Sequence, residues 1–296
     1  MTWLHRAGTL ATADTDLTVT PEIAEWAYSG LEVFNLDRTP SVSRDMSGIE
    51  GVIVPLSAQG VRVTVDGAAF DLVGRTGVFD AVSDWLYVPV GSRVTIEGTS
   101  GEVALCTAVA SEVFPVCYTP AESVAVEVRG AGFATRQVTN IATPDSFQAA
   151  HRINVCEVLT PGGNWSSWPP HRHDGIGDCP TTNEEIYYFR LGKLTEPHGS
   201  PEAVGLFHVY TVDRGVDETV TLADADVYLV PQGYHGPTVA PPEYPMYFLN
   251  VLAGPAPSRT MSFCDDPAHH WIRATWNTMP QDPRCPMTSA QGRVSQ

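Results

Sequence analysis

Basic residues are scarce in this sequence. Its 296 residues include 17 lysines and arginines against 34 aspartates and glutamates, which gives a formal net charge of -17. A field of this sign repels nucleic-acid phosphates and anionic membranes, so we expect neither as a partner. A small molecule fits better. If that molecule is itself an acid, a local cluster of arginine or lysine must override the field inside the pocket.

Long hydrophobic runs and closely paired cysteines are also missing. No run approaches the roughly 18 apolar residues of a membrane helix, and no basic region followed by an apolar run opens the chain. We therefore expect a cytoplasmic protein. Its six cysteines include no CxxC motif, which predicts reduced thiols; they are Cys106, Cys117, Cys156, Cys179, Cys264 and Cys285.

Helical periodicity is nearly absent, and short β-branched and aromatic runs recur instead, which predicts an all-β protein. These runs occupy residues 50–57, 61–65, 85–89 and 102–109 in the first half, and 153–160, 185–191, 205–211, 217–222, 226–230 and 245–252 in the second. Strands spaced in this way are typical of jelly-roll barrels or sandwiches.

The two halves share a local pattern that indicates an internal duplication. Residues 84–91 and 226–233 both read Asp, four apolar residues, Pro-x-Gly, and another apolar strand follows each. Loop-forming residues between about 118 and 150 mark the boundary. We expect two domains, residues 1–135 and 136–296, with a polar surface tail from Asp282 onward.

The residues with the clearest chemical potential lie in the second half. His171 and His173 stand at positions i and i+2, so on a strand both point to the same face. A strand that opens with Glu184 and Glu185 follows, and then a Pro-x-Gly turn that returns His235. Three imidazoles and one carboxylate would leave coordination positions open for water or substrate, as catalytic metal sites do.

These motifs resemble those of the cupin superfamily. More closely, residues 160–174, 184–188, 230–235 and 249–255 resemble the 5-deoxy-glucuronate isomerase family of myo-inositol catabolism. The resemblance covers almost the whole chain and implies two cupin-type jelly-roll barrels, a bicupin. Only the second barrel would hold a metal ion, because Arg93 stands in the first half at the position that matches His235.

The resemblance also implies the ligands and the reaction. The cupin carboxylate ligand stands seven residues before the strand-closing glycine, which selects Glu185 over Glu184. The implied metal site is His171, His173, Glu185 and His235, and the implied ion is zinc or manganese. The implied reaction converts 5-deoxy-D-glucuronate to 5-dehydro-2-deoxy-D-gluconate, an aldose–ketose isomerisation through a metal-stabilised enediol.

Several residues near the motifs are candidates for proton transfer and substrate binding. The catalytic candidates are Tyr187, Glu184 and Tyr234, with Tyr247, His208 and a metal-bound hydroxide as alternatives. For substrate binding we consider Arg190 and Arg214, because arginine clamps a carboxylate with two hydrogen bonds, and Tyr247 as part of the pocket wall.

Three other functions compete with the isomerase. The chain could be a metal-dependent cupin that acts on another uronate, an iron-dependent dioxygenase, or a non-catalytic bicupin that binds a sugar acid. Oxygen consumption favours the dioxygenase, and binding without ketose formation favours the non-catalytic protein. Homo-oligomers are common among such barrels.

Overall fold

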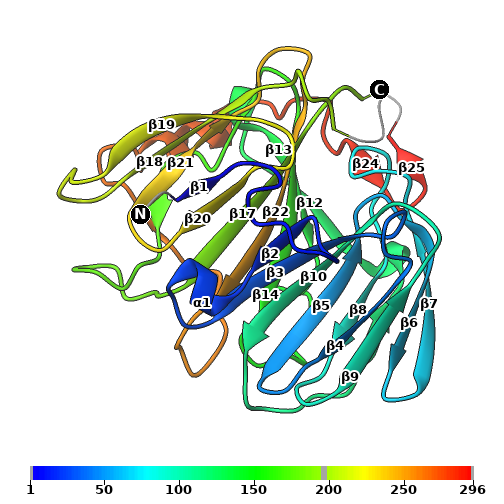
Figure 1. The fold of residues 1–296 in the computed structure, drawn as a ribbon. Coiled ribbons are helices and arrows are strands. Elements are labelled where there is room, and N and C mark those ends of the chain that lie inside the picture. The colour runs from blue at the N-terminus through cyan, green and yellow to red at the C-terminus, as the bar shows by residue number, and fades with distance from the viewer. Residues whose placement is uncertain (1–2, 195–198, 295–296) are drawn as a thin grey trace.

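The protein is built almost wholly of antiparallel β-strands (Figure 1), and the computed structural model describes residues 3–194 and 199–294. Within these residues the helices are short: α1 (Pro21–Ala24), α2 (Ile272–Thr275) and the 3-10 turns η1 (Ala121–Ser123), η2 (Gly132–Ala134) and η3 (Trp276–Thr278). The all-β prediction is confirmed. None of the helices in the described chain is long and apolar enough to cross a membrane.

The first half of the chain forms a barrel from two sheets. The larger sheet has the strand order β11 (Cys117–Thr119), β8 (Trp85–Val88), β5 (Ile49–Pro55), β10 (Glu102–Val109), β3 (Ser29–Asn35) and β2 (Leu17–Val19). The smaller has the order β4 (Ser41–Asp45), β9 (Arg93–Glu97), β6 (Gln59–Val65) and β7 (Ala68–Gly74). Apolar side chains of both sheets, such as Ile53 and Ile96, form one buried core.

The second half repeats this plan. Its larger sheet has the order β1 (Leu4–His5), β20 (Val227–Val230), β17 (Glu184–Leu191), β22 (Met246–Ala253), β14 (Asn154–Thr160), β13 (Arg136–Asn140) and β12 (Ala125–Arg129). The facing sheet has the order β19 (Asp217–Leu222), β18 (Gly205–Tyr210), β21 (Tyr234–Val239), β16 (His171–Arg172) and β23 (Cys264–Asp265), and β15 (Trp165–Ser166) pairs with β21. The core between them is aromatic, with Tyr187, Phe207 and Phe248 buried together.

The two larger sheets also pack on each other, which joins the barrels side by side (Figure 1). Val52 and Tyr87 of the first barrel share one buried cluster with Ile186, Tyr188 and Leu249 of the second. Each large sheet therefore has one face inside its own barrel and the other in the contact between barrels. This arrangement confirms the prediction of two jelly-roll barrels.

Both ends of the described chain cross to the opposite barrel. β1 pairs with β20, whereas β24 (Thr288–Ser289) and β25 (Gly292–Arg293) lie near the first barrel, where the Ser289 carbonyl accepts a 3.0 Å hydrogen bond from Val82 N–H. The expected surface tail is wrong for this segment, because Thr288 is buried and its N–H donates to Gln137. β12 precedes residue 136 but pairs with β13 in the larger sheet of the second barrel. The domain division at residue 135 stays a prediction.

Two glutamates fasten the barrels to each other in a reciprocal way. The buried carboxylate of Glu50, on β5, accepts hydrogen bonds from the backbone N–H groups of residues 151–153 at 2.5 to 2.8 Å. The carboxylate of Glu184, on β17, accepts from the N–H groups of residues 27–29 at 2.7 to 2.8 Å. Hydrogen bonds to a charged acceptor are stronger than neutral ones, so they offset the desolvation of both carboxylates. Glu184 thus serves the barrel contact.

Ion pairs add to this contact. Arg75 of the first barrel pairs with Glu157 of the second, both are buried, and Tyr247 Oη donates to Glu157 at 2.7 Å. Arg190 of the second barrel pairs with Glu102 of the first. Removing one partner of a buried pair typically costs about 3–5 kcal/mol, because the other charge stays buried. Arg190 and Tyr247 are thus held in the barrel contact.

Replacing Glu184 or Glu50 with glutamine should destabilise the protein. The new amide group would face backbone N–H donors, so we expect the free energy of unfolding to fall by about 1–3 kcal/mol in urea denaturation. Glu97→Gln, at an exposed position of β9, is the control and should change it by less than about 0.5 kcal/mol. An unchanged free energy of unfolding in both Glu184→Gln and Glu50→Gln would contradict the role of these carboxylates in joining the barrels.

Candidate metal centre

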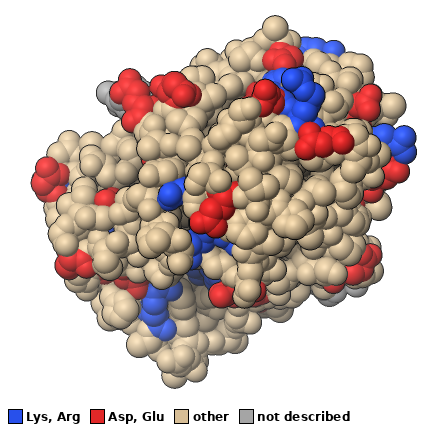
Figure 2. All heavy atoms as spheres, turned by 90° about the horizontal axis from the view of Figure 1, so that it is seen from below, with Lys and Arg blue, Asp and Glu red and all other residues tan. Residues whose placement is uncertain are grey.

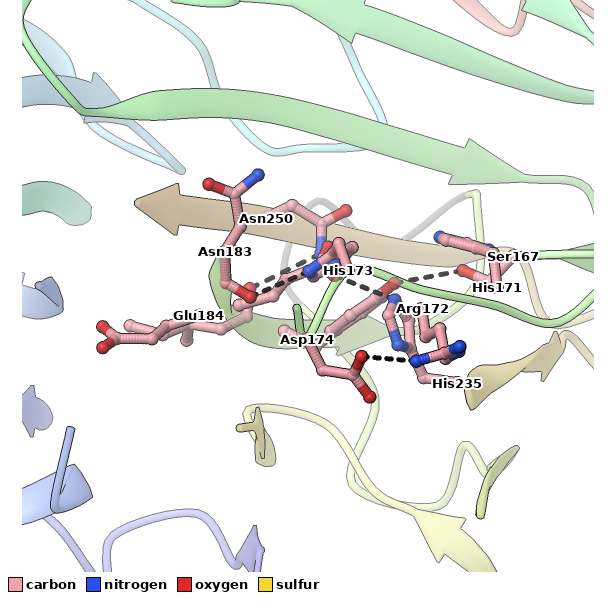
Figure 3. A network of polar contacts seen from close by, with 12 residues as sticks. Ser167, His171, Arg172, His173, Asp174, Asn183, Glu184, His235 and Asn250 are labelled. Carbon is pink, nitrogen blue, oxygen red and sulfur yellow. Dashed lines mark hydrogen bonds and ion pairs between the residues drawn. The ribbon is translucent and has the colours of Figure 1, made fainter. Parts of the chain in front are cut away.

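The predicted metal ligands lie on neighbouring strands of the second barrel. His171 opens β16 and lies opposite His235 of β21, and His173 follows two residues after His171. Glu185 is the second residue of β17, and the alternation of side chains along this strand points it into the barrel. Glu184 points away from the histidines (Figure 3).

Three of the four predicted ligands converge. The ligand atoms of His173, Glu185 and His235 all lie within 4.8 Å of one another, and all three residues are buried. The Nε2 atoms of His173 and His235 lie 2.9 and 3.0 Å from the same carboxylate oxygen of Glu185. Among the described residues, no other group of His, Cys, Asp and Glu side chains meets the same criterion.

The histidine rings are oriented by backbone carbonyl groups. Nδ1 of His173 bonds to Asn183 O at 2.8 Å, and Nδ1 of His235 bonds to Gly233 O at 3.3 Å. Such bonds turn Nε2 toward a common point, as they do around metal-bound histidines. His235 Nε2 is buried and makes no properly oriented hydrogen bond within the described chain, although Glu185 is near. This unsatisfied nitrogen fits a metal ion.

The fourth predicted ligand, His171, lies beside this group but outside it. The ring centre of His171 is 4.5 Å from that of His235 and 6.3 Å from that of His173. His171 lines a cavity together with His173 and Glu185. Its Nδ1 is 3.4 Å from Pro169 O, which leaves Nε2 available. The structure therefore brings three ligands together and places the fourth next to His235.

Burial and mutual contact shift the protonation of these residues. Burial alone would raise the pKa of Glu185, but the hydrogen bond with His173 and the close approach of both His173 and His235 hold it well below its usual value. Burial lowers the pKa of His171, and His235 adds to this shift. Burial also opposes the charged form of His173, but the hydrogen bond with Glu185, the charge of Glu185 and backbone hydrogen bonds together outweigh burial and raise the pKa. Glu185 is therefore ionised at neutral pH, as a metal ligand must be.

Asp174 holds the histidine segment against the turn that carries His235. One of its carboxylate oxygens accepts from Gly233 N–H at 2.9 Å, and the other accepts from Arg172 at 2.8 Å. Arg172 also lies over the ring of Tyr234, at 5.3 Å. Tyr234, a catalytic candidate from the sequence, therefore contacts Arg172. It does not line the cavity that His171, His173 and Glu185 share.

A disulfide bond joins Cys179 to Cys264, 85 residues later. The prediction of reduced thiols is wrong for this pair, whereas Cys106, Cys117, Cys156 and Cys285 are free. Sequence spacing hides the pairing, because β23 returns beside β16 with Cys264 opposite Arg172. The bond ties the loop after His173 to β23, next to the cavity wall at Phe263.

A cavity of about 630 Å³ opens onto the candidate centre. Ser167, Asn183, Tyr187 and Asn250 supply polar groups to its wall. Tyr187 Oη lies 3.3 Å from Ser167 Oγ, and burial together with the charge of Glu185 raises the pKa of the phenol well above its usual value. A tyrosine in this state keeps its proton at neutral pH and can donate a hydrogen bond to a ligand.

This cavity is lined by four arginines, Arg129, Arg136, Arg259 and Arg273. None of the four was proposed for substrate binding from the sequence. Arg129 and Arg136 lie on β12 and β13, in a segment near the expected domain boundary. The acidic composition was the available signal, because it demands a local cluster of arginine or lysine for an acidic ligand. On the face drawn in Figure 2, acidic and basic side chains are interspersed.

The structure does not bring the other candidates to the cavity. Arg214 is exposed, pairs with Asp217 at 2.8 Å and lies over the ring of Tyr210 at 3.8 Å. It lines a separate groove together with His208. Arg190 and Tyr247 face the first barrel, as described above. We therefore do not retain Arg190, Arg214 and Tyr247 as substrate contacts.

The two barrels and the buried His/Glu group define a cupin-type protein with a candidate metal centre in its second barrel. The sequence profile of the KduI/IolB family matches residues 3–272, and the chain belongs to this family.

Relatives with curated names support this assignment. The 5-deoxy-glucuronate isomerase of Geobacillus kaustophilus (strain HTA426) is 40% identical over 259 residues, which cover 86% of this chain and 89% of the relative. That of Bacillus subtilis (strain 168) is 36% identical over 260 residues, which cover 86% and 91%.

Solved structures agree with the fold. The crystal structure of an IolB-like protein from Salmonella typhimurium LT2 superposes with a TM-score of 0.81 at 30% identity, over 91% of this chain and 98% of that one. A Bacillus subtilis oxalate decarboxylase variant, with a TM-score of 0.53 and 14% identity over 84% of this chain and 74% of that one, shows the shared fold alone.

Loss of one ligand should weaken metal binding. We expect His235→Gln to lower the affinity for a divalent ion by at least about a hundredfold, since even the groups that orient a ligand contribute tenfold or more. Metal analysis after dialysis against a chelator measures the effect. His208→Gln, whose imidazole lies 2.9 Å from Asp217 in the separate groove, should keep its metal. Equal metal retention in both variants would rule out this centre.

Proposed function

We propose that the chain is a metal-dependent isomerase that converts 5-deoxy-D-glucuronate to 5-dehydro-2-deoxy-D-gluconate. The observation that carries this proposal is a His/Glu group that opens onto a cavity lined by polar side chains and arginines. Relatives named 5-deoxy-glucuronate isomerase, 36% and 40% identical, support the choice of substrate. We retain from the sequence the prediction of a cytoplasmic enzyme that acts on a small sugar acid.

His173, Glu185 and His235 would hold the metal ion, with His171 as the neighbouring fourth ligand. Zinc and manganese both accept imidazole and carboxylate ligands. When bound, the ion polarises the carbonyl and adjacent hydroxyl oxygens of the sugar and stabilises the negative charge of the enediol.

Tyr187 is the hydrogen-bond donor to the substrate that this geometry favours. An aldose–ketose isomerisation moves a proton between adjacent carbons and another between their oxygens. Tyr187 Oη lines the cavity next to Glu185, and the raised pKa of the phenol keeps it protonated. The hydroxyl can therefore donate a hydrogen bond to a sugar oxygen as charge develops there, while Ser167 Oγ, 3.3 Å away, fixes its direction.

The reaction is tested by incubating the metal-loaded protein with 5-deoxy-D-glucuronate in D2O. We expect NMR to show a ketose that carries deuterium beside the carbonyl, because an enediol exchanges its carbon-bound proton with solvent. Chelation should abolish the conversion, and added zinc or manganese should restore it. Bound metal without ketose formation would refute the proposed reaction.

Removing the Tyr187 hydroxyl should slow turnover. We expect Tyr187→Phe to lower kcat by about a hundredfold to a thousandfold, the range of one lost hydrogen-bond donor to developing charge, with metal content unchanged. Tyr210→Phe is the control, because that hydroxyl bonds to Asp266 and does not line the cavity. If Tyr187→Phe turns over at the rate of the unmodified protein, the Tyr187 hydroxyl does not stabilise the developing charge.

A further inference from the structure

Arg136 is a buried cation without a carboxylate partner. Its residue is only 9% exposed, and its Nη1 donates a 3.0 Å hydrogen bond to the carbonyl of Ala134. No Asp or Glu among residues 3–194 and 199–294 forms an ion pair with it. Its guanidinium lies over Trp276, 5.6 Å from the ring centre, and lines the cavity. Burying an unpaired charge is costly, so this arrangement calls for an anionic ligand.

The other three cavity arginines are already occupied. Arg129 pairs with Glu127 at 2.6 Å, and Arg273 forms two hydrogen bonds with Asp265 at 2.5 and 2.7 Å. Arg259 donates to backbone carbonyl groups, such as that of Ile153 at 2.8 Å. Within the described chain, Arg136 is the one member of the four that has neither a carboxylate partner nor more than one hydrogen bond.

The surroundings of Arg136 fix its position and add to the positive potential. Burial lowers the pKa of Arg136 to about 9, and the nearby charges of Arg129 and Arg273 contribute. Arg273 lies over the same indole ring, 5.3 Å from the centre of Trp276. Gly130 lets the guanidinium lie against the backbone, because a Cβ atom there would come within 2.7 Å of Nη1. The guanidinium is therefore held in place before a ligand binds.

We propose that Arg136 binds the carboxylate of the sugar acid and thereby sets the direction in which the substrate lies in the cavity. The carboxylate end lies at Arg136, near Trp276, and the aldehyde end lies at the His/Glu group. This inference rests on the proposed function for the identity of the sugar acid, whereas the anion site rests on the contacts of Arg136.

This assignment has a consequence for specificity. A planar guanidinium forms two parallel hydrogen bonds with a carboxylate, which a neutral hydroxymethyl group cannot match. A neutral aldose would leave Arg136 buried and unpaired, so the cavity should reject it. The same contact explains how a chain with a net charge of -17 attracts an anion.

The test compares two ligands that lack an aldehyde and are not isomerised. Calorimetric titration of the metal-loaded protein uses D-gluconate, which carries a carboxylate, and D-glucitol, its neutral counterpart. We expect gluconate to bind at least about tenfold more tightly than glucitol, and Arg136→Met to remove most of this difference. Arg136→Lys should keep part of this difference in affinity, because lysine retains the positive charge but lacks the two parallel N–H donors of a guanidinium. Arg214→Met, in the separate groove, is the matched control and should bind like the unmodified protein.

The outcomes separate this inference from the proposed function. Gluconate binding by Arg136→Met within about twofold of the unmodified protein would overturn the inference, and so would an unchanged KM for 5-deoxy-D-glucuronate. If the unmodified protein produces no ketose but Arg136 still controls gluconate binding, the anion site stands and the proposed reaction fails. Metal content and melting temperature check folding. Arg136→Lys carries the same test if Arg136→Met does not fold.

Discussion

The alternation of side chains along β17 is the constraint on which both the candidate site and the barrel contact depend. Glu185 and Tyr187 point into the second barrel, toward the histidines and the cavity. Glu184 and Arg190 point the other way and bind the first barrel. A shift of one residue in register would exchange the two sets of side chains. It would place Glu184 in the cavity and Glu185 in the contact between the barrels. The first barrel therefore helps to fix the register that aims Glu185.

The arginines of the second barrel differ in how fully they are neutralised, and this difference separates structural from binding roles. Arg190 is buried between Glu102 and Asp224, so its charge is satisfied within the protein. Arg136 is buried to a similar degree, but its hydrogen bonding within the described chain is to a backbone carbonyl. The unpaired guanidinium lines the cavity, as do His173 and Glu185, and the unsatisfied Nε2 of His235 lies beside these two residues. A metal ion at His235 and the carboxylate of a sugar acid at Arg136 would meet these two demands.

Local patterns predicted the strands and the two barrels. They also pointed to His173, Glu185 and His235, which the structure brings together, because an HxH pair and a strand-opening glutamate report directly on which side chains share a face. They did not give the location of Arg190 and Tyr247, which lie opposite each other in the pairing of β17 with β22 and both face the first barrel. Nearness to a motif in sequence does not give the face. Arg136 and the Cys179–Cys264 bond were missed because both depend on contacts between distant segments.

The central claim is that one cavity holds a metal ion at the His/Glu group and a carboxylate at Arg136. A crystal structure of the zinc- or manganese-loaded protein with D-gluconate tests it most directly, with anomalous scattering to locate the ion. The account predicts an ion bound by Nε2 of His173, Nε2 of His235 and the carboxylate of Glu185, and a gluconate carboxylate on the Arg136 guanidinium. An ion elsewhere, or a gluconate carboxylate bound away from Arg136, would contradict it.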